Sequence, residues 1–347
     1  MNRVFFGDCR DTMRDLIAQG VKVQMCVTSP PYFGLRDYGH AGQLGLEATP
    51  AEFVAAMVEV FALVRELLAD DGVLWLNLGD SYNAAGRTGH GTRQGFKQGT
   101  NRASAEKADN CRPSVETLKP KDLIGIPWRV AFALQADGWY LRQDIIWHKP
   151  NPMPESVTDR CTKAHEYLFL LSKRERYYFD NEAIKEPAAP ASLARWAQDV
   201  EGQIGSDRVP GKTNGNMKAV GGRSKRDSFK RDDSKRAEVI PGQTVGTHRP
   251  DREESTWDTE MRNRRSVWTV ATVPYKGAHF ATFPPELIEP CILAGSRSGD
   301  TVLDCFFGSG TTGEVAGNLG RNWIGCEIND QYAPLQQART AQRGLAL

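Results

Sequence analysis

The stretch TVLDCFFGSGTTG, residues 301–313, decides the fold. It opens with a run at 301–304 that is mostly apolar and β-branched and predicts a buried strand, and a glycine-rich turn follows. The next residues, 314–319, predict a helix, and residues 322–327 predict another strand. A strand, a tight turn, a helix and a second strand indicate an α/β fold built on a parallel sheet.

The N-terminal part of the chain alternates in the same way. Residues 3–7 and 23–28 predict strands, and Thr49-Pro50 opens a helix in which Glu52 holds the capping-box position. The remaining elements are a helix over 11–18, an end of the Thr49 helix at Gly72, a strand over 73–78, a helix over 127–136, strands over 140–147 and 167–171, and a helix beginning at Pro284. This alternation predicts a mostly parallel sheet with helices on both faces.

Composition is that of an ordinary soluble protein. The chain has 347 residues, a net charge of +1, 40% hydrophobic and 25% charged residues. No apolar stretch is long enough to span a bilayer, and the first residues lack the apolar core of a signal peptide. Seven cysteines without a C-x-x-C pair predict a protein of the reducing cytoplasm with no metal site.

Two polar segments divide the chain. We expect a catalytic half over 1–185 with a polar loop at 83–121, a variable basic insert over 186–265, and a half over 266–347 that completes the same sheet. The insert concentrates cations between Arg223 and Arg236. It is either a solvated disordered segment or a region that contacts nucleic-acid phosphates and recognises the target.

The glycine turn predicts a nucleotide-type site. Glycines let the backbone approach a ligand closely, and the following helix offers free N–H groups. Asp304 and the aromatic Phe306 precede the glycines, so the site suits a ligand that carries an ammonium and a sulfonium better than a pyrophosphate. Glu327 ends the next strand and is suited to accept hydrogen bonds from ribose hydroxyls.

A second constellation, Ser29-Pro30-Pro31-Tyr32, directly follows the strand over 23–28. Two prolines fix the backbone and remove two N–H donors, so nearby carbonyls are held without competing donors. The amino group of adenine or cytosine is a poor nucleophile because its lone pair is delocalised. The Ser29 hydroxyl and the Pro30 carbonyl can grip its two hydrogens, and Tyr32 can stack on a flipped base.

Together these motifs resemble the amino-methyltransferase family of restriction–modification and phage DNA methylases. Their order, with the base motif first and the cofactor loop last, resembles the permuted β group of that family. The resemblance implies a Rossmann-like S-adenosylmethionine-dependent methyltransferase fold, S-adenosylmethionine as cofactor and double-stranded DNA as substrate. Gly7-Asp8-Cys9 resembles the segment whose acid approaches the cofactor adenine. The implied cofactor-binding residues are Asp8, Asp304, Phe306, Gly308, Ser309, Gly310, Thr311, Thr312 and Glu327.

A serine before Pro-Pro-Tyr favours cytosine N4 in this family, with adenine N6 as the alternative. Rival functions are an NAD-type dehydrogenase, a methyltransferase of protein or RNA, and a DNA-binding protein without activity. A partner restriction endonuclease and a homodimer stay open, and no membrane association is expected. Secondary candidates for the site are Asp80, Trp147, His148, Lys149, His279 and Phe280.

Overall fold

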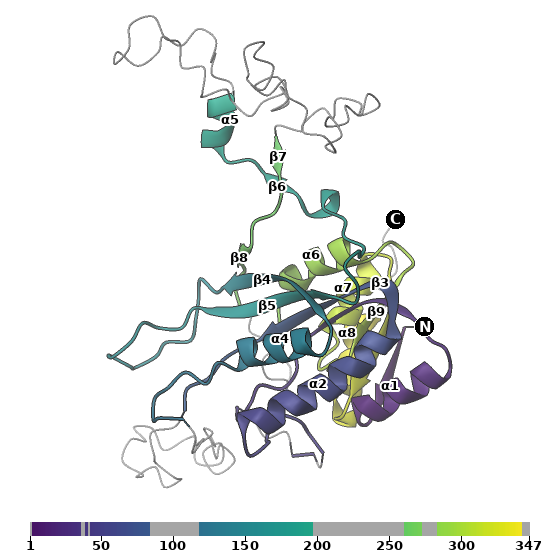
Figure 1. Ribbon diagram of the computed structural model, residues 1–347. Coiled ribbons are helices and arrows are strands. Elements are labelled where there is room, and N and C mark those ends of the chain that lie inside the picture. Colours follow the sequence, from purple (N-terminus) through teal and green to yellow (C-terminus); the bar gives the residue numbers. More distant parts are fainter. Residues whose placement is uncertain are drawn as a thin grey trace, which may run out of the picture. The chain divides into compact units, whose positions relative to one another are not determined.

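The computed structural model describes residues 2–35, 39–40, 42–83, 118–196, 260–272 and 283–341. The chain divides into two compact units. The larger unit takes in residues 1–184 and 265–347, and the smaller one residues 185–264. The larger unit contains an eight-stranded sheet, drawn in Figure 1.

All strands of this sheet except β5 run in one direction. β5 is antiparallel to both of its neighbours, and every other neighbouring pair is parallel. The predicted mostly parallel sheet is therefore confirmed. The spatial order is β1 (Arg3–Phe6), β10 (Asn322–Glu327), β9 (Thr301–Asp304), β2 (Val23–Thr28), β3 (Leu68–Leu78), β5 (His165–Ser172), β4 (Tyr140–His148) and β8 (Val267–Thr269).

Helices cover both faces of the sheet, as predicted. One face packs against α1 (Cys9–Ala18), α2 (Pro50–Leu67) and α4 (Ile126–Ala136), which lie together in Figure 1. The other face packs against α6 (Pro285–Gly295) and α7 (Thr311–Asn318), and α8 (Ala333–Thr340) lies against α7. Among the described residues, Glu182–Ile184 and Asp330–Tyr332 of the larger unit form short 3₁₀ helices.

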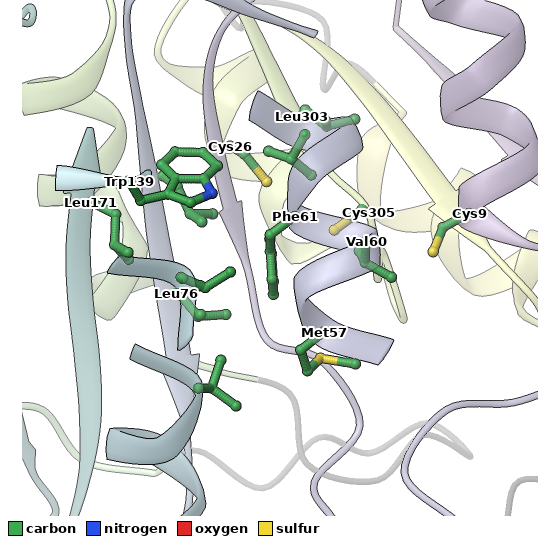
Figure 2. Packing of buried hydrophobic residues seen from close by; sticks show 14 of the residues in the cluster. Cys9, Cys26, Met57, Val60, Phe61, Leu76, Trp139, Leu171, Leu303 and Cys305 are labelled. Atoms are coloured by element: carbon green, nitrogen blue, oxygen red, sulfur yellow. The ribbon is translucent and has the colours of Figure 1, made fainter. Parts of the chain in front are cut away.

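The core on the α2 side shows why this helix forms where it does. Thr49 caps α2 by accepting a hydrogen bond from the Glu52 amide over 3.2 Å, as the capping signature predicts. The apolar face of α2 then lies against the sheet, and Figure 2 shows Phe61 and Val60 near Cys26 and Cys305. Their complete burial makes this face a main source of hydrophobic stabilisation.

The predicted end of α2 at Gly72 is wrong. The helix ends at Leu67, and Leu68 already pairs with Val23 in the sheet. The register between β2 and β3 then shifts, so that Val73 pairs with Met25. Gly72 lies in this irregular stretch, where an added Cβ would come within 2.9 Å of the Gln24 carbonyl oxygen. The glycine therefore permits a close approach of two backbones rather than ending the helix.

The described part of the smaller unit is short. β6 (Glu186–Pro187) pairs antiparallel with β7 (Met261–Arg262), and Arg262 Nε lies 3.0 Å from Glu186 Oε1. α5 spans Pro190–Trp196. The basic residues between 223 and 236, most of the polar loop at 83–121, and the candidates His279 and Phe280 all lie outside the described residues. None of the described helices is long and apolar enough to cross a bilayer.

The neighbouring strands β9 and β2 come from opposite ends of the chain. From β9 the chain proceeds to β10 on one side, and from β2 it proceeds to β3 on the other side. Such a reversal of strand order opens a crevice beyond the carboxyl ends of the strands, which is where open α/β sheets bind ligands. Both motifs singled out in the sequence directly follow these two strands.

Candidate active site

A cavity lies at this edge of the sheet, with about 1130 Å³ of free space that includes its opening to solvent. Its walls combine the ends of β1, β2, β9 and β10. Of the residues predicted to bind the base or the cofactor, secondary candidates aside, all except Asp304, Gly310 and Thr312 line it. The others in its wall are Gly7, Cys9, Leu35, Gly42, Gln43, Leu44, Phe283, Cys305, Phe307, Cys326, Ile328, Asn329 and Tyr332.

Asp304 joins β9, β2 and α7 beneath this cavity. Its Oδ1 accepts hydrogen bonds from Thr28 Oγ1 at 2.6 Å and from the Phe306 amide at 3.1 Å, and its Oδ2 accepts one from Thr312 Oγ1 at 2.6 Å. Burial raises the pKa of this carboxyl to about 6, against the opposing effect of these donors. The arrangement suits a residue that shapes the loop, whereas the sequence suggested a direct partner of the ligand ammonium.

The glycines of the loop are needed for two different reasons. Gly308 and Gly310 have φ values of +52° and +89°, a region that disfavours other residues. Gly313 leaves room for Phe307, because an added Cβ would lie 2.7 Å from its ring. Phe307 in turn stacks on Trp323, with ring centroids 5.1 Å apart. The turn is thus held against its neighbouring strand, and Gly310 is the N-cap of α7.

Glu327 closes the other side of the loop. Its Oε2 accepts a hydrogen bond from the Gly308 amide at 2.7 Å, and its Oε1 accepts one from the Asn329 amide at 2.9 Å. Burial nevertheless raises the pKa of this carboxyl to about 7. Each carboxylate oxygen can accept a further hydrogen bond from a ligand in the cavity.

Asp8 follows β1 and caps α1 by accepting from the Arg10 amide at 2.8 Å. Its carboxylate also pairs with the Arg10 guanidinium at 2.5 Å, and this hydrogen-bonded pair lowers the pKa of Asp8. Because Asp8 caps the helix, α1 begins at Cys9, two residues before the predicted start. The pair holds the Asp8 carboxylate in a fixed position in the cavity wall.

The base motif occupies the end of β2. Tyr32 Oη donates a hydrogen bond to Glu166 Oε2 at 2.7 Å and lies 3.1 Å from Asn77 Oδ1. Its ring packs on the backbone of Gly79, where an added Cβ would come within 2.5 Å of Cε2. The tyrosine is therefore fixed both by its hydroxyl and by one edge of its ring.

Glu166 and Asn77 were missed by sequence reasoning. They lie on the antiparallel neighbours β5 and β3, and Asn77 Nδ2 donates to Glu166 Oε2 at 3.3 Å. Lys149, a secondary candidate, forms an ion pair with Glu166. The sequence held one signal for them, since both are polar residues beside apolar ones. Asn77 lies within the apolar run 73–78, and Glu166 directly precedes the run 167–171.

The other secondary candidates have structural partners. Asp80 accepts hydrogen bonds from the amides of Gly125 and Ile126 at the start of α4. Trp147 is buried and donates from Nε1 to the Val270 carbonyl at 2.9 Å. His148 Nδ1 lies 3.1 Å from Thr269 Oγ1. No cluster of three or more His, Cys, Asp or Glu side chains suited to a metal ion occurs among the described residues.

A family model described as "DNA methylase" matches residues 23–338, which takes in both motifs and nearly all of the sheet. The chain belongs to this DNA methylase family. The family model is named for N6 and N4 methylation. This is the amino-methyltransferase family that the two sequence motifs resemble. The NAD-type dehydrogenase considered from the sequence is thereby excluded.

Close relatives agree with this membership. The chain is 41% identical to the Type II methyltransferase M.SmaI of Serratia marcescens, over 98% of this chain and 91% of that protein. It is 42% identical to the Type II methyltransferase M.Cfr9I of Citrobacter freundii, over 96% of this chain and 85% of that protein. This DNA methylase is therefore a Type II DNA methyltransferase of the restriction–modification kind.

Solved structures share the fold. PvuII DNA methyltransferase (cytosine-N4-specific) matches with a TM-score of 0.55 and 16% identity, over 99% of this chain and 87% of that one. A putative DNA modification methylase from Thermus thermophilus, complexed with S-adenosyl-L-methionine, matches with a TM-score of 0.53 and 20% identity, over 100% of this chain and 96% of that one. The Rossmann-like methyltransferase fold predicted from the sequence is confirmed.

The cofactor of this DNA methylase is S-adenosylmethionine, as predicted. The donor set around the cavity fits it. A buried carboxyl at Glu327 suits ribose hydroxyls, apolar and aromatic walls suit the adenine, and the strand-end loop at 304–312 permits close backbone approach. The cavity extends from this loop to Ser29, Pro30 and Tyr32, so one space is bordered by both motifs.

Proposed function

We propose that this DNA methylase transfers a methyl group to the exocyclic N4 amino group of cytosine in double-stranded DNA. One observation carries the proposal. Ser29-Pro30-Pro31-Tyr32 and the loop at 304–312 follow adjacent strands and border one cavity. The Thr28 hydrogen bond to Asp304 ties the two strand ends together. A base and a methyl donor held there would lie side by side, and such positioning is the main catalytic device for a direct displacement.

The base motif supplies what an exocyclic amine requires. The Ser29 hydroxyl and the Pro30 carbonyl would each accept one of its hydrogens, which favours a tetrahedral nitrogen with an available lone pair. Tyr32 would stack on the extruded base, since its ring is already fixed against Gly79. When bound, S-adenosylmethionine supplies a methyl group on a positively charged sulfur.

On the cofactor side we assign roles from the same geometry. Glu327 would accept hydrogen bonds from the ribose hydroxyls, and Asp8 would approach the adenine. Phe306, Gly308, Ser309 and Thr311 line the cavity and would contact the remaining cofactor, while Asp304, Gly310 and Thr312 would shape the loop beneath.

Cytosine N4 rests on Ser29, the residue type that accompanies cytosine in this family. Adenine N6 is the alternative. Nucleoside mass spectrometry of DNA from cells expressing the chain is expected to detect N4-methyldeoxycytidine. If N6-methyldeoxyadenosine is found in its place, the target base is adenine and not cytosine. If neither modified nucleoside is found, the proposal of amino methylation is rejected. Sequencing that reports modified bases would give the recognition sequence from the same DNA.

Two further proposals concern partners. As a Type II methyltransferase, the chain would protect the recognition sequence of a restriction endonuclease, and DNA from expressing cells should then resist that nuclease.

We also infer that the basic residues 223–236 contact DNA phosphates, so that affinity for DNA should fall steeply with salt. The oligomeric state, for which a homodimer was one expectation, can be measured by analytical ultracentrifugation.

Cofactor affinity should depend on pH through Glu327. The pKa of this carboxyl is about 7, so the charged form that best accepts ribose hydrogen bonds is incompletely populated near neutrality. Affinity for S-adenosylmethionine is expected to rise between about pH 6.5 and 8.5, by at most about tenfold per unit. Isothermal titration calorimetry would measure it. In Glu327→Gln the affinity should be lower and this pH dependence should disappear; a dependence that persists would refute the assignment.

A further inference from the structure

A series of hydrogen bonds leads away from the base motif toward a partly buried carboxylate. Ser29 Oγ donates to Tyr32 Oη over 3.5 Å, and Tyr32 Oη donates to Glu166 Oε2 over 2.7 Å. Both donors point in the same direction, from the serine that borders the cavity to the carboxylate on β5. The first link is long and the second is short, so the strongest interaction lies at the carboxylate.

The carboxylate at the end of this chain is fixed from several sides. Lys149 pairs with its Oε1, and Asn77 Nδ2 donates to its Oε2 over 3.3 Å. The side chains of Lys149 and Glu166 are only 18% and 15% exposed, and Lys149 Nζ also lies 4.2 Å from the centroid of the Trp147 ring. Removing two charges from water costs free energy, and this cost can exceed the gain from their attraction. We therefore looked for a functional role of the Lys149–Glu166 ion pair.

Amino methylation requires the removal of a proton, and this series of hydrogen bonds can accept it. The nitrogen gains a methyl group while it still carries two hydrogens, so it becomes positively charged and must lose a proton. We propose that Ser29, Tyr32 and Glu166 form a proton relay that removes it. The proposal rests on the proposed function, because it requires the amino group to lie at Ser29.

The transfer balances in atoms and charge. The N–H bond of the methylated amine breaks, and its electron pair returns to the nitrogen. Ser29 Oγ takes that proton while its own proton passes to Tyr32 Oη, and the tyrosine proton passes to Glu166 Oε2. The amine becomes neutral, the carboxylate becomes a carboxylic acid beside Lys149, and solvent later removes the proton from Glu166.

The same series of hydrogen bonds would also activate the amine before the proton moves. A carboxylate that accepts from Tyr32 polarises its hydroxyl, which then accepts more strongly from Ser29, and Ser29 Oγ becomes a better acceptor for the amine hydrogen. Lys149 forms its ion pair with Glu166, and Lys163 and His165 are further basic groups that interact electrostatically with this carboxylate. Glu166 therefore acts on the amine through two hydroxyls.

The first test replaces the acceptor. Glu166→Gln keeps the size of the side chain but cannot take up a proton. Single-turnover methyl transfer is expected to fall by about 100- to 1000-fold, the usual contribution of a positioned acid or base. Dissociation constants for DNA and S-adenosylmethionine should stay within about twofold of wild type, and any solvent deuterium isotope effect of the wild type should disappear. Glu289→Gln, at an exposed position of α6, is the matched control and should retain full rate.

The second test uses Tyr32→Phe, which removes one oxygen and keeps the ring. It should reproduce the rate loss and the isotope result of Glu166→Gln, and the double variant should be no slower than the slower single variant, because the three groups act as one unit. Should Glu166→Gln fail to fold, Tyr32→Phe alone decides the question by the same readouts.

Three results would overturn the relay: an unchanged rate in either variant, additive losses in the double variant, or a rate loss matched by an equal loss of DNA affinity. These are distinct from failure of the proposed function, in which the wild-type chain itself would leave no methylated amino group in DNA.

Discussion

Gly79→Ala is expected to reduce methyl transfer about 100-fold, the order of loss that follows a displacement of about 1 Å at a reacting group. The new Cβ would lie 2.5 Å from Tyr32 Cε2 and 2.9 Å from Cδ2, so the ring must move. Its hydroxyl is held by Glu166 and Asn77, so the movement tilts the surface on which the base would stack. Single-turnover transfer of a labelled methyl group to DNA measures the loss.

Cofactor binding should separate this effect from misfolding. Gly79 is not among the residues that line the cavity, and affinity for S-adenosylmethionine should remain close to that of the wild type. Gly317→Ala is the matched control, because a Cβ there meets no atom within 4 Å and alanine favours a helix. Full activity in Gly79→Ala would show that Tyr32 does not form the base-stacking surface.

Asp304→Asn is expected to lower the free energy of unfolding by on the order of 3 kcal/mol and to weaken cofactor binding at the same time. Asparagine keeps the shape but presents an NH₂ group where the carboxylate accepts from Thr28, Thr312 and the Phe306 amide. At least one of these donors then loses its buried acceptor. The loop at 304–312 and the junction of β9 with β2 should both loosen.

Chemical denaturation and calorimetric titration of the cofactor would measure the two effects. Asp11→Asn is a suitable control, since the Asp11 side chain is 77% exposed and its ion pair with Arg14 lies at the surface. A variant of Asp304 that keeps wild-type stability and loses only cofactor affinity would contradict the positioning role. It would instead support the direct contact with the ligand ammonium that the sequence suggested.

Strand positions were the most predictable part of the fold. The bounds of β2, β9 and β10 match the predicted 23–28, 301–304 and 322–327, because each is an apolar run bordered by turn-forming or polar residues. The start of β3 could not be read in this way. Residues 69–72 lie between two registers of the β2–β3 pairing, and the reason, the close approach of Gly72 to Gln24, exists only in three dimensions.

The candidate site was predictable where a motif directly follows a strand. Ser29, Tyr32, Phe306 and Glu327 line the same cavity because parallel strands end at the same edge of the sheet. Glu166 was not predictable, since it reaches Tyr32 only through the antiparallel strand β5, whose place between β3 and β4 depends on pairing across long stretches of sequence. Asp304 was found, but its burial, which changes its expected task, was not.

The place of β9 between β10 and β2 has a consequence for biosynthesis. While the ribosome is still making the middle of the chain, the edge of β2 that will receive β9 has no partner, and about 270 residues separate the two strands in sequence. Such long-range pairing slows folding, and it leaves a strand edge with unpaired backbone N–H and C=O groups that can pair with other chains. We therefore expect the nascent enzyme to depend on chaperones that shield this edge, and to become active only after release of nearly the whole polypeptide.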